Sequence, residues 1–186
     1  MMKFEIVEAY KNIIDESFIP VRSTEGSAGY DILAAEDTIV PSIFTINDKL
    51  LKKQDRIEMD FGKEPYTLKA IDEIINTHSN RATLIPTGLK ACMPEGKVLS
   101  IRSRSSMPYK HLLIVANGPS TIDADFHNNP QNEGHISVML INLSVYDILI
   151  EKGDKIAQFI FESFYTTDDE EIVTAKRNGG YGSTGK

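Results

Sequence analysis

Asp123 is the side chain whose surroundings best suit chemistry, because it lies between Ile122 and the small residue Ala124. A carboxylate held by apolar neighbours has a restricted rotamer and restricted hydration, and a general base needs both. Aspartates also cap strand ends and form turns in many proteins. The local pattern therefore leaves two roles open for Asp123, a general base or a turn former.

A run of two arginines and three hydroxyls extends from Arg102 to Ser106. A guanidinium binds phosphate through two hydrogen bonds, and hydroxyls and backbone amides can complete the shell around the anion. Alternating arginine and serine also suits the exposed face of a strand. We therefore expect either an oxyanion clamp or a solvated strand face here.

Two further polar residues have informative neighbours. Asp31 follows small residues at 27–29, which let the backbone bend or approach another group closely, although a turn with a capping aspartate fits equally well. Gln158 alternates with Ile156 and Ile160 in an expected strand. A glutamine in apolar company should have a dedicated hydrogen-bond partner.

The stretch 176–186 is rich in glycine and carries an arginine, a tyrosine and two hydroxyls. Such a segment is too glycine-rich to order by itself. It nevertheless suits a flap that orders over a phosphate and a base. Its glycine spacing differs from that of the P-loop, and no expected strand and helix flank it, so that motif is excluded.

These residues must be positioned by strands, because most of the chain alternates with a period of two. The stretches 120–126 and 134–142 indicate a β-hairpin closed by a polar loop at 127–133. Other strands are expected at 4–8, 98–103, 111–115, 145–150 and 155–161, and turns at 86–88, 94–97 and 151–154.

The region 42–81 differs from the rest, since its leucines and isoleucines fall near helical spacing among charged residues. We expect two short amphipathic helices at about 45–80, inserted into an otherwise β chain. They could pack over the core, or they could form a lid or a module that binds a protein partner.

The composition bounds the class of protein. At 186 residues, 41% hydrophobic and 25% charged, the chain suits a single soluble domain spanning 1–186. A net charge of −7 argues against a nucleic-acid surface. No apolar run approaches the roughly 20 residues that span a bilayer, so no membrane partner is expected. The single cysteine, Cys92, favours a reducing, cytoplasmic compartment (host cytoplasm if the source is viral).

Taken in order, the polar stretches resemble the five motifs of the trimeric dUTP diphosphatases, or dUTPases. Each motif is weak alone, but five in the same order are specific. The match excludes 42–81 and the loop tip. The matching stretches are 28–32, 104–107, 122–126 with 134–142, 153–158, and 177 with 179–185, and 86–89 also matches a segment of the family.

This resemblance implies an all-β, jelly-roll fold and a homotrimer with three active sites shared between subunits. The first, second and fourth motifs would come from one subunit, the third from another, and a flexible C-terminal arm at about 170–186 from the third subunit. The implied reaction splits dUTP into dUMP and pyrophosphate.

The resemblance also implies roles for individual residues. Asp123 would activate water for attack on the α-phosphorus, and Asp31 would reach a Mg²⁺ ion through water. The other implied substrate contacts are Arg104, Ser105, Ser106 and Gln158 at phosphate oxygens, Arg177, Ser183 and Thr184 over the γ-phosphate with Gly182 beside them, Tyr181 on uracil, Asn117 in the uracil pocket, Ile122 next to Asp123, and Phe126 against deoxyribose.

Two alternatives remain. The dCTP deaminases resemble dUTPases in fold and early motifs, but they carry a catalytic glutamate where this chain has Met139, and they lack the glycine-rich fifth motif. Methionine cannot transfer the proton that deamination requires. The other alternative is a regulatory binding protein on a dUTPase scaffold, acting through the insert at 42–81.

Overall fold

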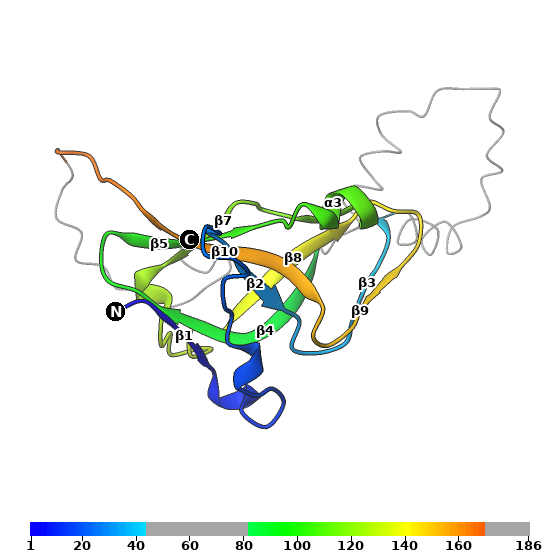
Figure 1. The fold of residues 1–186 in the computed structure, drawn as a ribbon, viewed down its shortest axis with the longest axis horizontal. Helices are drawn as coiled ribbons and strands as arrows, with labels where there is room; N and C mark the ends of the chain where they lie inside the picture. The colour runs from blue at the N-terminus through cyan, green and yellow to red at the C-terminus, as the bar shows by residue number, and fades with distance from the viewer. Residues whose placement is uncertain (44–81, 170–186) are drawn as a thin grey trace.

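The computed structural model describes residues 1–43 and 82–169, which form two four-stranded antiparallel sheets and a two-stranded ribbon (Figure 1). Sheet A has the order β1-β4-β8-β6, sheet B the order β2-β10-β5-β7, and the ribbon pairs β3 with β9. The strands are β1 Lys3–Ile6, β2 Tyr30–Leu33, β3 Thr38–Val40, β4 Thr83–Cys92, β5 Lys97–Arg102, β6 Leu113–Val115, β7 Ser120–Asp123, β8 Ile136–Asn142, β9 Ile148–Ile150 and β10 Lys155–Ser163.

The helical content of the described residues is small. The short helices are η1 Glu8–Tyr10, η2 Glu16–Phe18, α3 Ser106–His111 and η3 Ala124–Phe126. None of the helices in this part of the chain is long and apolar enough to cross a membrane. The two helices expected within 45–80 lie outside the described residues.

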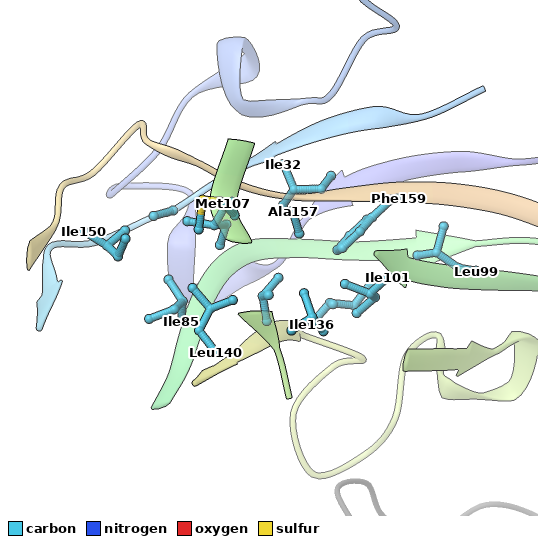
Figure 2. Packing of buried hydrophobic residues seen from close by; sticks show 14 of the residues in the cluster. Ile32, Ile85, Leu99, Ile101, Met107, Ile136, Leu140, Ile150, Ala157 and Phe159 are labelled. Atoms are coloured by element: carbon cyan, nitrogen blue, oxygen red, sulfur yellow. The ribbon is translucent and has the colours of Figure 1, made fainter. Parts of the chain in front are cut away.

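The inner faces of sheets A and B share one hydrophobic core (Figure 2). Sheet A contributes Ile85, Ile136 and Leu140, and sheet B contributes Leu99 and Phe159, all of which are almost fully buried. In β8 every second residue is buried, as the period of two predicts. The core therefore fixes sheet B by its inner face and leaves its outer face available for polar groups.

The expected hairpin between 120–126 and 134–142 is wrong. β7 pairs with β5 in sheet B, whereas β8 pairs with β4 and β6 in sheet A, and residues 124–126 form η3. Alternation shows that a strand has a buried face, but it carries no information about the neighbour with which that strand pairs. The segment 127–135 therefore crosses from one sheet to the other; we call it the crossover loop.

The turn expected at 86–88 is a bulge inside β4, where the pairing with β8 shifts register between Pro86 and Leu89. Proline tolerates this position because a bulge needs no amide donor. Gly88 has φ +70°, which strains any residue with a side chain, and a Cβ there would lie 2.5 Å from Cδ1 of Ile14, so this position favours glycine. The turns expected at 94–97 and 151–154 are confirmed.

Three expected strands are shorter than predicted. The strand expected at 4–8 ends at Ile6, because η1 begins at Glu8. Residue 111 belongs to α3, which ends where Leu112 takes a left-handed conformation, so β6 begins only at Leu113. The strand expected at 145–150 is reduced to β9, because the Asn142 amide donates to the carbonyl of Tyr146 at 2.7 Å and folds the preceding residues into a loop.

The region 44–81 is flanked by two residues that lie against the same strand, β8. Ser42 forms an isolated parallel bridge with Asn142, and Thr83 pairs with Leu140. Ser42 is fully buried, and its hydroxyl donates to the carbonyl of Ser144 at 2.5 Å. The chain on both sides of 44–81 is therefore fixed by the core sheet.

His135 gives the fold a dependence on pH. The amide of Gly88 donates to its Nε2 at 3.0 Å, and the ring of Tyr10 lies 4.8 Å from the imidazole. Burial lowers the pKa of His135, and the carboxylates of Glu36 and Glu133 oppose this without cancelling it. The folded state therefore disfavours the protonated imidazole.

We expect acidification from pH 7 towards pH 5 to lower the free energy of unfolding, by less than about 1.4 kcal/mol per pH unit for this one proton. The unfolded chain binds the proton near the ordinary histidine pKa, whereas the folded chain resists it. His135→Gln keeps a neutral acceptor and should flatten this slope in urea titrations. The exposed His111→Gln is the control, and an unchanged slope in His135→Gln would contradict the prediction.

Candidate active site

The centre of the candidate site is the carboxylate of Asp31, on β2. Its Oδ1 accepts hydrogen bonds from Nε of Arg104 at 2.9 Å and from Nε2 of Gln158 at 3.3 Å. Its Oδ2 accepts from Nζ of Lys155 at 2.9 Å and from the hydroxyl of Ser23 at 3.3 Å. Residues from three of the motif stretches thus meet at one carboxylate.

Burial by itself would raise the pKa of Asp31, whose side chain is 11% exposed. Hydrogen bonds from Lys155, Gln158 and Arg104 outweigh this effect and hold the pKa below its usual range. Asp31 is therefore ionised at neutral pH, and it fixes the directions of two cationic side chains and one amide.

The backbone at Gly29 shows why small residues precede Asp31. A Cβ at this position would lie 3.2 Å from Cδ and Oε1 of Gln158, so the glutamine packs directly against the glycine. Gln158 has the dedicated partner that its sequence context predicted, namely Asp31. The expected alternation with Ile156 is broken, because a register shift at the start of β10 buries both Ile156 and Ala157.

The arginine–serine run is divided by the end of β5. The Arg102 guanidinium forms an ion pair with the Glu162 carboxylate. The Ser103 hydroxyl accepts a hydrogen bond from the amide of Val115 at 3.0 Å. Arg104 turns instead to Asp31, and its Nη1 donates to the Ser106 hydroxyl and to the carbonyl of Lys155 at 3.5 Å each. Ser105 precedes α3 as its N-cap residue. The strand-face interpretation therefore holds for Arg102 but not for 103–106, where Arg104 stands beside two serines.

Asp123 lies on the outer face of sheet B, as Asp31 does, but at a different position along the strands. In the strand register, Asp31 lies opposite Gln158 of β10, and Gln158 lies opposite Arg102 of β5. Asp123 lies opposite Val98 of β5. Val98 and Arg102 are four positions apart on β5, which corresponds to about 13 Å at the rise of a strand. Within one chain, Asp123 therefore stays apart from the Asp31 cluster.

The residues expected around the base and the sugar differ in how far they are exposed to solvent. Asn117 is exposed, and its Oδ1 accepts from the Ser120 hydroxyl at 2.5 Å. Ile122 is half-buried and packs against the core, and Phe126 is only 5% exposed within that core. Stacking of Phe126 on deoxyribose would need more of its ring to be accessible, so that role stays a prediction.

The expected tail contacts, namely Arg177, Tyr181, Gly182, Ser183 and Thr184, lie outside the described residues. Lys155 and Ser23 were missed as partners of Asp31. For Lys155 a signal existed, since it lies three residues before Gln158 in the fourth motif. Among the described residues, no group of three histidine, cysteine, aspartate or glutamate side chains is arranged to hold a metal ion.

Comparisons with known proteins agree with this arrangement of strands and motifs. A family model described as dUTPase matches residues 65–185. The deoxyuridine 5'-triphosphate nucleotidohydrolase of Lactococcus lactis is 37% identical over 183 residues, which cover 98% of this chain and 96% of the relative. The protein of the same name from Rickettsia rickettsii (strain Sheila Smith) is 34% identical over 171 residues, covering 90% and 88% of the two chains.

Solved structures show the same fold. The dUTPase of Streptococcus mutans superposes with a TM-score of 0.65 at 30% identity, covering 89% of this chain and 98% of that one. The dUTPase of Staphylococcus aureus phage phi11 gives a TM-score of 0.57 at 17% identity, covering 92% and 96%, and supports the fold alone. The fold is thus the all-β, dUTPase-like jelly roll that the sequence predicted. The chain belongs to the dUTPase family.

Proposed function

We propose that this chain is a dUTP diphosphatase, which hydrolyses dUTP to dUMP and pyrophosphate. Relatives that carry the name of this activity match nearly the whole chain. The observation that carries the proposal is the convergence of Arg104 and Gln158, from two separate motifs, on Asp31 of a third. This cluster orients a guanidinium and an amide for contact with phosphate oxygens.

The test is pyrophosphate release from dUTP, dTTP, UTP and dCTP measured in parallel. We expect turnover with dUTP and at most slow turnover with the other three nucleotides. Ammonia released from dCTP would instead support the deaminase alternative. A protein inert towards dUTP in the presence of Mg²⁺ would refute the proposed function.

Asp123 is proposed as the general base, which takes a proton from the water that attacks the α-phosphorus. Ile122 packs against the core beside it, so the backbone that carries the carboxylate is held in place. Phosphoryl transfer depends more on positioning and charge neutralisation than on covalent help. The principal task of the protein is therefore to bring Asp123, water and the triphosphate together.

A Mg²⁺ ion is proposed as the cofactor, and when bound it neutralises charge on the phosphates. The donor set of the described residues fits an indirect contact. Arg104 and Lys155 already balance the charge of Asp31, which leaves this carboxylate little attraction for a bare cation. Hydrogen bonds to water molecules around the ion remain compatible with it.

The separation of about 13 Å along β5 supports a site shared between subunits. We propose that Asp123 of one subunit serves the Asp31 cluster of a neighbour, in a homotrimer with three such sites. Cyclic symmetry supplies each cluster with one Asp123 from the next subunit. The same proposal treats 1–186 as one domain with an insert at 42–81 and an arm at 170–186.

Removal of the tail after Lys176 should abolish most dUTP turnover without unfolding the β core, because the fifth motif would be lost. kcat/KM and the melting temperature should be compared with those of the full chain. A chain shortened only by Lys186 is the matched control. Full activity in the longer truncation would remove residues 177–186 from the proposed site.

A further inference from the structure

The crossover loop, residues 127–135, begins directly after η3, whose N-cap residue is Asp123. It folds back onto the end of that helix. The amide of Asn129 donates to the carbonyl of Phe126 at 3.1 Å, and the amide of Glu133 donates to the carbonyl of Asn129 at 2.7 Å. A Cβ on Gly134 would lie 2.5 Å from the Phe126 carbonyl. The loop and the end of η3 are therefore joined by direct backbone contacts.

Glu133 ties this loop to the N-terminal part of the chain. Its Oε1 accepts from Nζ of Lys90, on β4, at 2.6 Å, and its Oε2 accepts from the amide of Glu8 at 2.8 Å. Nζ of Lys90 also donates to Oδ1 of Asn128 at 2.7 Å. The Lys90 side chain is 11% exposed and the Glu133 side chain 38%, so the ion pair is shielded from solvent on its lysine side.

The backbone of Glu133 indicates that its side chain is needed. Its φ is +61°, a left-handed conformation that glycine or asparagine adopts with less steric conflict. Glu133 nevertheless uses both carboxylate oxygens, and the hydrogen bonds from Lys90 and from the amide of Glu8 lower its pKa. A glutamate kept ionised in a strained conformation points to a requirement for the contacts that it makes.

We propose that Glu133 and Lys90 are positioning residues for the reaction. They fix the crossover loop against β4 and η1, and through η3 they set the position of the Asp123 carboxylate. The inference rests on the proposed function, in which Asp123 activates the attacking water. Neither residue needs to touch the nucleotide. Small displacements of a catalytic group lower rates strongly, so a loosened loop should act on the chemical step.

The test compares Lys90→Met and Glu133→Gln with Lys11→Met. Lys11 also carries a positive charge beside Glu8, but its side chain is 57% exposed and its ammonium donates to the Glu8 carboxylate rather than reaching the loop. We expect kcat for dUTP to fall about 10-fold in Lys90→Met and Glu133→Gln, with KM changed less than about 3-fold. Lys11→Met should match the original chain.

Two further variants separate positioning from bulk stability. The double variant Lys90→Met/Glu133→Gln should lose about 10-fold rather than 100-fold, since the two residues act through one contact. Lys90→Arg keeps the charge and should retain most of kcat. Hydrogen exchange should accelerate in peptides covering 124–135 for Lys90→Met and Glu133→Gln, and stay unchanged in Lys11→Met.

The outcomes distinguish this inference from the proposed function. If the original chain turns over dUTP and both variants match Lys11→Met, the positioning role is refuted and the proposed function stands. If the original chain is inert towards dUTP, the proposed function fails, and hydrogen exchange still tests the tether. Unchanged exchange in 124–135, or losses of kcat that only follow the fraction unfolded, would overturn the inference.

Discussion

Asp123→Asn is expected to lower kcat for dUTP by about 10² or more, the usual scale for the loss of a general base. Asparagine has nearly the same shape as aspartate but cannot take a proton from water at neutral pH. Asp123 is exposed at the end of β7, and the core lies on the other face of sheet B, so the fold should not change. Affinity for dUTP should also be nearly intact.

The measurement is steady-state pyrophosphate release, with dUTP affinity and the melting temperature determined on the same preparations. Asp168→Asn makes the same change of charge at an exposed position away from the motifs and serves as the control. Turnover of Asp123→Asn equal to that of the control would remove Asp123 from its assigned role.

The second large effect is a recovery of activity on mixing two inactive proteins. Asp123→Asn should lack the base, and Arg104→Gln should lack the guanidinium held by Asp31. If each site takes these residues from different subunits, mixed trimers contain some sites that have both. Random assembly of equal amounts restores about one site in four in a cyclic trimer.

The two variants should be unfolded together, refolded and assayed for dUTP hydrolysis. Refolding each variant alone gives the baseline, and size-exclusion chromatography counts the subunits. Activity that never rises above the two baselines, in mixtures that are verified trimers, would contradict a site divided between subunits. Such a result would require Asp123 and Arg104 to act within a single chain.

Some of the fold was predictable because it depends on local chemistry. The alternation in 136–142 correctly gave β8, and Gly153 and Gly96 marked real turns. The requirement that Gln158 have a partner was also correct, because a polar group beside a core must be satisfied wherever the strand pairs. These inferences depended only on the local sequence around each residue.

Pairing between distant segments was not predictable in the same way. The hairpin between 120–126 and 134–142 failed because periodicity is identical in a strand that pairs with its successor and in one that joins another sheet. Lys155 was missed since its role depends on β2 lying beside β10. The separation of Asp123 from Asp31 within one chain likewise follows from register across β5, which the local pattern does not reveal; only the family resemblance implied that the two residues act from different subunits.

Ser42 and Thr83 contact β8 at residues that are two positions apart, which is about 7 Å along a strand. A peptide of almost any length can span so short a gap at little entropic penalty. The two anchor points therefore place little restraint on the length of the chain between them. Passages of different length can therefore join the same two anchors without a change in the register of β8.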